Sequence, residues 1–495
     1  MVFSRIDKTA FSTLGNAYLL AFLARGAEIL FFVSLFSLFT VEEVGLYSWG
    51  IAVSAFFAIA IDLGLNQVLI RNFSRRAIGV GFALKGSMMI RFPLILICFA
   101  VLAVWGNKWN PSSESFRVVV LASTIQLFVA AENFCFAWLR SHSRQNVANA
   151  LGVLDPVGRL AIFFFICVLL HEYTAVGLLT GIVIWHIPVI IVSAVVVARL
   201  HGAADRGPVT NLSLSAVKNQ LLLPGMVFCL IGLITVMQNR LDWLLVAHFT
   251  GQVELANYAV ANKAYEMLML MGGIAMTTIY PWLCRESAKS AFIRRLNIIT
   301  TGVLACGSAF ALGAALYLPQ VMEWVWGDKY QSAYGLVRIL LPISVISIAI
   351  MILYYRLIAR GMETTLLKAS IVVTIIQLLV NISTIPVYGA VGAVFGMASL
   401  AVCNYAFYAQ TARRVGVMSN QSIVRQVCFV LIMFVIGVVI KQFDMPMYIG
   451  LVVLCVSCAS AWFAMMLTYR EQQWLKVYIG RLRVQMRGNF RTNEV

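Results

Sequence analysis

The segment IGLVVLCVSCASAWFAMMLTY, residues 449–469, contains no charged side chain. An α-helix of this length spans the hydrocarbon core of a bilayer, which is about 30 Å thick. Comparable stretches recur from end to end, the first running from Asn16 to Leu38. At about 20 residues per span, the sequence predicts an all-α polytopic membrane protein with about fourteen transmembrane helices.

The composition excludes a water-soluble globular enzyme. Apolar and aromatic residues make up 61% of the chain, charged residues only 12%, and the mean hydropathy is +0.89. Soluble domains carry about 25% charged residues. In a soluble protein, the formal charge of +17 would indicate a nucleic-acid partner. In a membrane protein, the distribution of positive charge among the connecting segments instead indicates which side of the membrane each segment lies on. We therefore expect membrane lipid, and no nucleic acid, as a partner.

Lys and Arg residues fall mainly in alternate connecting segments, including both terminal segments. The opposite segments hold only Lys108, Arg117, Lys329, Arg338 and Lys441. Basic residues are enriched on the cytoplasmic side, and an even number of helices puts both termini on one side. Both termini are therefore predicted to be cytoplasmic. No connecting segment is long enough for a separate catalytic domain, so no enzyme activity is expected.

The two halves of the chain share a weak internal similarity. Phe39-Thr40 and Phe249-Thr250 each precede a helix that ends at an Arg. Their offset of about six helices indicates two pseudo-symmetric six-helix lobes, an arrangement that places a substrate site between lobes. The expected division is an N-terminal lobe at 1–200, a C-terminal lobe at 201–415, two additional helices at 416–468 and a basic cytoplasmic tail at 469–495.

Charged residues inside the predicted helices indicate a polar chamber, because a charge in the bilayer core is costly unless it is paired or hydrated. They concentrate in the helices expected at 14–38, 46–70, 220–247 and 256–282. Some can neutralise each other along one helix face, being three or four residues apart: Arg25 with Glu28, Asp155 with Arg159, and Lys263 with Glu266. Arg240 and Asp242 are two residues apart, so each needs a partner elsewhere.

Two carboxylates, Asp62 and Glu132, have no cation three or four residues away. We expect them to be unpaired and suited to proton exchange, with Asp62 the first candidate for ion coupling and Glu132 the second. The alternative for each is a hydrogen-bonded packing role. Arg91, about one turn from its helix end, is expected to extend to the lipid headgroups. The other candidate chamber carboxylates are Glu28, Asp242 and Glu266.

Three cations in the predicted chamber helices form the candidate headgroup site: Arg25, Arg240 and Lys263. A cationic chamber attracts an anion, and Arg binds phosphate oxygens through paired donors. Polar and aromatic neighbours can contact sugars by hydrogen bonding and ring stacking; the candidates are Trp49, Asn239, Tyr258 and Asn262. For the aromatic side chains, an interfacial belt is the alternative.

Several segments resemble bacterial polysaccharide repeat-unit flippases of the multidrug/oligosaccharidyl-lipid/polysaccharide (MOP) exporter superfamily. VGLYSWGIAVSAFFAIAIDLGLNQVLIR, residues 44–71, is similar to the family's second helix, and RLDWLLVAHFTGQVELANYAVANKA, residues 240–264, to its seventh and eighth. Residues 340–361 and 381–399 resemble its tenth to twelfth helices. The resemblance covers nearly the whole chain, although its motifs consist mostly of packing residues.

The resemblance implies a flippase of the bacterial inner membrane. It would move undecaprenyl-diphosphate-linked oligosaccharide from the cytoplasmic to the periplasmic leaflet by alternating access, for O-antigen or exopolysaccharide biosynthesis. Asp62 and Glu132 indicate H⁺ or Na⁺ as the coupling ion, and a polysaccharide polymerase and a chain-length regulator are expected as partners. No cofactor and no metal site are expected.

The sequence leaves three other interpretations open. A multidrug and toxin extrusion antiporter of the same superfamily would be expected to have twelve helices and an acidic chamber, which the two additional helices and three chamber cations disfavour. A membrane-embedded enzyme using a polyprenyl substrate would need a sizeable extramembrane loop. A non-transporting partner of a polysaccharide assembly complex is the third interpretation.

Overall fold

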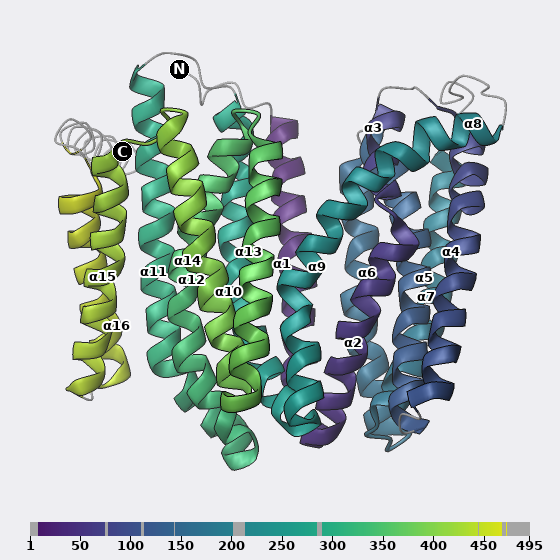
Figure 1. The fold of residues 1–495 in the computed structure, drawn as a ribbon, viewed down its shortest axis with the longest axis horizontal. Helices are drawn as coiled ribbons and strands as arrows, with labels where there is room; N and C mark the ends of the chain where they lie inside the picture. Colours follow the sequence, from purple (N-terminus) through teal and green to yellow (C-terminus); the bar gives the residue numbers. More distant parts are fainter. Residues whose placement is uncertain are drawn as a thin grey trace, which may run out of the picture. The chain divides into compact units, whose positions relative to one another are not determined.

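The computed structural model describes residues 8–74, 78–109, 113–142, 144–200, 213–284, 290–443, 445–467 and 472, which are almost entirely helical (Figure 1). No strand occurs in these ranges. When α2 is counted with α3, and α8 with α9, the described residues form fourteen helical segments. The all-α prediction and the predicted number of helices are therefore confirmed.

The chain divides into two compact units, Met1–Ala259 and Val260–Val495. The first unit contains α1 (Lys8–Leu38), α2 (Val41–Asp62), α3 (Leu65–Ser74), α4 (Val80–Trp109), α5 (Ser113–Ser141), α6 (Gln145–Phe164), the π-helical turn η2 (Phe165–Leu169), α7 (Ala175–Leu200), α8 (Leu214–Val217), the π-helical turn η4 (Lys218–Leu222) and α9 (Leu223–Thr250). Helix α10 (Gln252–Cys284) begins in the first unit and continues into the second.

The second unit contains the rest of α10 together with α11 (Ser290–Trp326), the 3₁₀ turn η5 (Gly327–Tyr330), α12 (Gln331–Ile358), α13 (Glu363–Tyr388), α14 (Ala390–Arg414), α15 (Asn420–Gln442), α16 (Met447–Ala461) and the π-helical turn η6 (Trp462–Met466). Here α11 packs on α12 and α13 on α14, while α15 and α16 pack on α11. The predicted basic tail at 469–495 lies outside the described residues except for Gln472.

The first unit extends one helix past the predicted lobe end at residue 200. Helix α9 accounts for this, because it packs against α2 and α3 of that unit. The crossing is close at the break between α2 and α3, where Leu63 and Gly64 have φ values of 45° and 69°. A Cβ on Gly64 would collide with the backbone of Gly225. Glycine at positions 64 and 225 therefore lets α9 approach the break between α2 and α3, next to Asp62.

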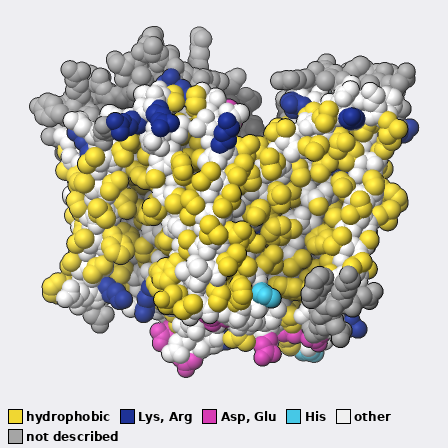
Figure 2. Space-filling model, in the orientation of Figure 1, with side chains coloured by type: hydrophobic (Ala, Val, Ile, Leu, Met, Phe, Trp, Pro, Cys, Tyr) yellow, Lys and Arg dark blue, Asp and Glu magenta, His cyan; other side chains and the backbone are white. Residues whose placement is uncertain are grey.

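The helices carry apolar side chains on their outer faces. Eleven segments of the described residues are long and apolar enough to cross a membrane, and one of them, Ile298–Ile358, contains most of α11 together with all of α12. Large apolar side chains such as Phe22, Phe92 and Leu431 are more than half exposed. Figure 2 shows such side chains covering the sides of the helices, with Lys and Arg near the helix ends. This distribution suits a lipid environment, and the protein is a multi-pass membrane protein.

Helices α13 and α14 form a tight hairpin. The turn residue Gly389 has a φ of 58°, in the left-handed region that favours glycine. A Cβ on Gly392 would lie 2.5 Å from the carbonyl carbon of Thr384. The Thr384 hydroxyl also donates a hydrogen bond to the Gly392 carbonyl at 3.0 Å. The contact is therefore backbone against backbone, and the neighbour cannot move aside as a flexible side chain would.

We predict that Gly392→Ala lowers the free energy of unfolding by about 1–3 kcal/mol, because the added methyl group overpacks this contact. The control is Gly335→Ala in α12, whose added Cβ meets nothing within 4 Å. That substitution should be neutral or stabilise the helix by up to about 1 kcal/mol. Thermal unfolding of the two purified variants in mild detergent measures the difference, and equal stability would contradict the hairpin packing.

Candidate functional site

The three pairs predicted from spacing along single helices are present as ion pairs. Arg25 Nη1 lies 2.6 Å from Glu28 Oε2, Arg159 Nε lies 2.7 Å from Asp155 Oδ1, and Lys263 Nζ lies 2.8 Å from Glu266 Oε2. Each pair keeps two opposite charges together on one helix face. Two of the pairs, on α1 and α6, belong to the first unit, and the pair on α10 belongs to the second.

Asp62 is paired, contrary to the sequence-based expectation. Arg91 on α4 donates from Nη2 to Asp62 Oδ1 at 2.8 Å and from Nη1 to the carbonyl of Ala130 on α5 at 3.2 Å. The Arg91 side chain is only 11% exposed, so the expectation that it extends to the headgroups is also wrong. Because Arg91 contacts both α2 and α5, it connects three helices of the first unit. Because its carboxylate is paired with Arg91, Asp62 is no longer the first candidate for proton exchange.

Glu132 is not isolated either. His186 on α7 donates from Nδ1 to Glu132 Oε1 at 2.7 Å, and both side chains are buried. The Phe128 ring on α5 lies parallel to the imidazole at 6.2 Å. Sequence reasoning missed His186, although the signal was present: it is the sole ionisable side chain in the apolar run LLTGIVIWHIPVIIVSAVVVA, residues 178–198. An ionisable residue in such a run is functional by default.

The imidazole links Glu132 to a second carboxylate. His186 Nε2 lies 3.6 Å from Asp155 Oδ1, within electrostatic reach but too far for a hydrogen bond. Within the described part of the chain, this nitrogen has no hydrogen-bond partner. The Asp155 and Arg159 side chains are more than a quarter exposed, whereas Glu132 is 6% and His186 0% exposed. Three helices thus hold a row of ionisable groups that runs from an accessible end to a sealed one. We call Arg159, Asp155, His186 and Glu132 the charged row.

Further charged groups surround the accessible end of the charged row. The buried hydroxyl of Tyr47 on α2 interacts electrostatically with Arg159, Asp155, Glu28 and Arg240. These residues come from α6, α1 and α9, so three helices of the first unit place charges within electrostatic range of the Tyr47 hydroxyl on α2. Two of the three predicted headgroup cations, Arg240 directly and Arg25 through its pair with Glu28, belong to this group. Lys263 belongs to the second unit.

Asp242 and Arg240 have partners beyond each other, as their spacing predicted. Asp242 accepts hydrogen bonds from the Tyr258 hydroxyl and, at 2.9 Å, from the Trp243 backbone N–H. The Arg240 guanidinium lies over the Trp243 ring, 4.6 Å from its centroid. Asp242 and Tyr258 are both almost fully buried. They join α9 to α10 and are not accessible to a substrate in this structure.

The other predicted sugar-contact residues differ in accessibility. Asn239 is exposed and donates to the Thr235 carbonyl at 2.7 Å. Trp49 is partly buried, with its ring 5.7 Å from that of Trp105. Asn262 is 4% exposed, and its Nδ2 lies 3.5 Å from Glu266 Oε1. Asn239 and Trp49 therefore remain candidates for direct contact, whereas Asn262 supports the Lys263 and Glu266 pair. No group of metal-ligating side chains occurs among the residues that the structure describes.

Comparison with solved structures identifies the fold. The lipid II flippase MurJ in an inward closed conformation aligns with a TM-score of 0.66 at 11% identity, over 90% of this chain and 99% of that one. The multidrug transporter DinF-BH gives 0.55 at 14% identity, over 83% and 96%. A MOP superfamily transporter from Pyrococcus furiosus gives 0.50 at 14%, over 81% and 94%. All three are transporters or flippases rather than enzymes, so the fold class is that of the MOP transporters.

The family is shown by sequence. The family model for polysaccharide biosynthesis proteins matches residues 15–286, which is more than half of the 495 residues. The chain therefore belongs to the polysaccharide biosynthesis protein family. No curated protein matches the chain in sequence.

We predict strong energetic coupling between Asp62 and Arg91. Either residue replaced by Ala leaves a charge unpaired in the first unit, and the double variant removes both charges, so a double-mutant cycle should give a coupling energy of about 1–3 kcal/mol. The measurement is the free energy of unfolding in mild detergent.

The control cycle combines Arg91→Ala with Glu114→Ala. Glu114 is an exposed residue on α5, and it lies about 24 Å along the helix from the Ala130 carbonyl that Arg91 contacts. These two changes should be additive to within about 0.5 kcal/mol. Additivity in the Asp62 cycle as well would refute the pairing.

Proposed function

We propose that the protein flips a lipid-linked oligosaccharide across the bacterial inner membrane, from the cytoplasmic to the periplasmic leaflet, by alternating access. The observation that carries the proposal is the set of charges that α1, α6 and α9 place around the Tyr47 hydroxyl of α2 in the first unit. Charged residues inside a membrane protein mark substrate or ion pathways, so this cluster suits an ionic headgroup. Membership of the polysaccharide biosynthesis family and the fold shared with a lipid II flippase support this substrate class.

The proposed headgroup ligand is the diphosphate of an undecaprenyl-type carrier lipid. Arg25 and Arg240 of the first unit would bind its oxygens, since guanidinium groups form charge-assisted hydrogen bonds with phosphate. Lys263 is the third proposed headgroup cation and belongs to the second unit. Arg25 and Lys263 already pair with Glu28 and Glu266. A diphosphate would compete with these carboxylates for the cations, which lowers its net affinity and favours its release. Asn239 and Trp49 are the proposed contacts for the sugars.

The orientation of the chain is part of the proposal. The asymmetry of Lys and Arg between alternate connecting segments supports cytoplasmic termini. With this orientation, the glycan would be delivered to the periplasmic side for O-antigen or exopolysaccharide assembly. A polysaccharide polymerase and a chain-length regulator are the proposed downstream partners.

We predict that replacing Arg25, Arg240 or Lys263 with Ala slows transport about tenfold or more, because each change removes charge-assisted hydrogen bonds to the diphosphate. The assay is flipping of a fluorescent polyprenyl-diphosphate glycan in reconstituted vesicles, read by a quencher added outside. Arg117→Ala is the control, since Arg117 is exposed at the beginning of α5. Arg25→Ala combined with Glu28→Gln restores the charge balance and should still be slow.

Two results would decide against the proposed substrate. Full transport rates in all three single variants would remove the headgroup site. Transport of a cationic dye in place of the glycan would favour multidrug extrusion, the function that DinF-BH has on the same fold.

We propose the charged row as the coupling element and the proton as the coupling ion. The Glu132 and His186 pair is sealed, whereas Asp155 and Arg159 are partly exposed, so a proton entering at Asp155 can reach Glu132 through the imidazole. An imidazole can accept a proton at one ring nitrogen and release one from the other. Its nitrogen is also a poor ligand for a hard cation such as Na⁺, which prefers oxygen.

We predict that a pH gradient with the acidic side at the substrate's destination speeds wild-type flipping, because inward proton movement then drives outward substrate movement. Glu132→Gln and His186→Asn should each abolish this acceleration while leaving gradient-free flipping measurable. The acceleration should persist in the Arg117→Ala control. An unchanged response to the gradient in Glu132→Gln and His186→Asn would exclude the charged row, and equal acceleration by a sodium gradient would exclude the proton.

A further inference from the structure

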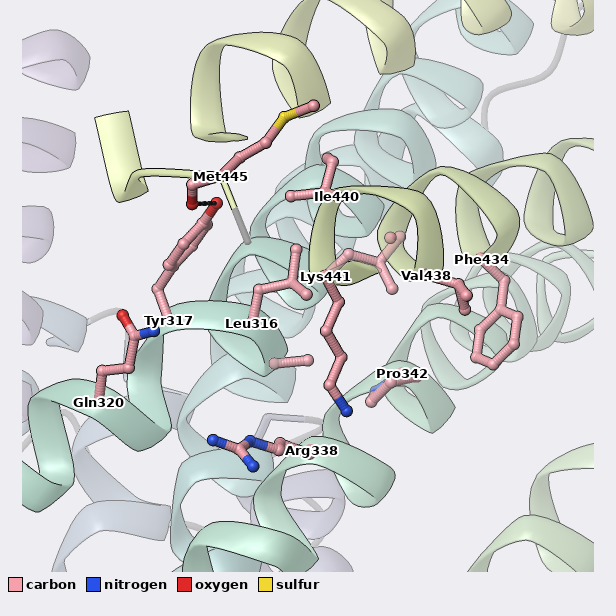
Figure 3. Close-up of a pocket in the computed structure, with 13 residues that line it drawn as sticks. Leu316, Tyr317, Gln320, Arg338, Pro342, Phe434, Val438, Ile440, Lys441 and Met445 are labelled. Carbon is pink, nitrogen blue, oxygen red and sulfur yellow. Dashed lines mark hydrogen bonds between the residues drawn. The ribbon is translucent and has the colours of Figure 1, made fainter. Parts of the chain in front are cut away.

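A pocket of about 350 Å³ lies within the second unit, where α11, α12 and α15 meet (Figure 3). Its polar lining residues are Tyr317 and Gln320 of α11, Arg338 of α12 and Lys441 of α15. Much of the remaining lining is apolar and includes Pro342 and Phe434. This pocket is separate from the charged row, which belongs to the first unit.

Two cations, Arg338 and Lys441, line this pocket, and no carboxylate among the described residues compensates them. Figure 3 shows the Lys441 side chain extending across the pocket toward the side where the Arg338 guanidinium lies. None of the described residues that line the pocket is acidic. In the described part of the chain, neither cation forms an ion pair. Two like charges in one pocket repel each other, and an anion between them would offset that repulsion.

The position of the pocket indicates a lipid headgroup. Lys441 is the penultimate residue of α15, and Arg338 lies seven residues into α12, which is about 10 Å from the helix start. The cations therefore lie near one end of the spans, at the depth of phosphates rather than of acyl chain ends. A Lys in the last turn of a helix also suits the helix dipole, but this does not explain why Arg338 on another helix faces the same space.

The apolar face next to the pocket can hold an acyl chain. Phe434 and Val438 line the pocket and are about half exposed. Leu431 and Val435, one turn back along α15, are each 59% exposed. These positions continue one apolar face from the pocket toward the middle of the span. A ligand that fits both parts has an anionic phosphate and a long hydrocarbon chain.

We propose that this pocket binds an anionic phospholipid, with its phosphate between Arg338 and Lys441 and an acyl chain along α15. Guanidinium and ammonium groups together suit a phosphate diester, and basic pockets between transmembrane helices bind anionic lipid headgroups. The bound lipid joins α15 to α11 and α12 and so fixes the α15 and α16 hairpin on its unit. The inference does not depend on the proposed transport activity.

The test uses the full-length protein in nanodiscs of phosphatidylcholine with a small fraction of phosphatidylglycerol. Native mass spectrometry counts the phosphatidylglycerol that the protein retains. Arg338→Gln combined with Lys441→Gln should bind this lipid about tenfold more weakly, since charge-assisted hydrogen bonds are lost. The control, Arg117→Gln combined with Lys329→Gln, removes the same charge elsewhere and should match the wild type.

Two further measurements distinguish the possible sources of the bound phosphate group. Retention of a polyprenyl diphosphate but not of phosphatidylglycerol would overturn the proposal in favour of a substrate site. Displacement of the lipid by millimolar inorganic phosphate would overturn it in favour of a free-anion site. Equal retention by the wild type and the double variant, or equal loss in the control, would also overturn it.

A conservative variant guards against loss of folding. Lys441→Arg keeps the charge and should retain phosphatidylglycerol, whereas Lys441→Gln alone should weaken its binding. The melting temperature should rise with phosphatidylglycerol in the wild type and in Lys441→Arg but not in the double variant. A rise in the double variant equal to that of the wild type would contradict the site.

Discussion

The high cost of an unpaired charge in hydrocarbon governs how the helices of this protein pack. Water is absent from the bilayer core, so each ionisable side chain there needs a partner inside the protein. In the first unit this requirement joins helices that are distant in sequence: Arg91 connects α4 to α2 and α5, and His186 connects α7 to α5. Apolar packing holds many pairs of helices together, but these polar contacts determine which faces meet and at what depth.

The fold could be predicted from sequence because membrane spans depend on length and apolarity, which are local properties. Ion pairs along one helix were predictable for the same reason, since α-helical geometry fixes the distance between residues three or four apart. Partners from different helices were not predictable. Asp62 and Glu132 were expected to be unpaired, yet their partners lie 29 and 54 residues away in the chain. Such contacts depend on the relative depth and rotation of two helices, which the spacing in one sequence does not encode.

The candidate site was only partly accessible to sequence reasoning. Residue type and membrane depth identified Arg25 and Arg240, whereas burial separated Tyr258 and Asp242 from the residues that a substrate can reach. His186 was overlooked because its importance comes from the two carboxylates around it rather than from a motif. The charged row combines the predicted pair on α6 with an unpredicted pair between α5 and α7. Its path from a partly exposed end to a sealed end emerges only when these helices are seen together.

The contact between Asp62 and Arg91 has a consequence for how this protein can evolve. Loss of either residue leaves the other charge unpaired. A protein in which one of the two residues is replaced before the other is therefore destabilised until the second one changes. Replacement of both by apolar residues, or an exchange of the two charges between α2 and α4, avoids that destabilisation only when both positions change together. Among relatives, these two positions should therefore vary in concert, and the backbone carbonyl of Ala130, which no substitution can remove, should favour retention of a donor on α4.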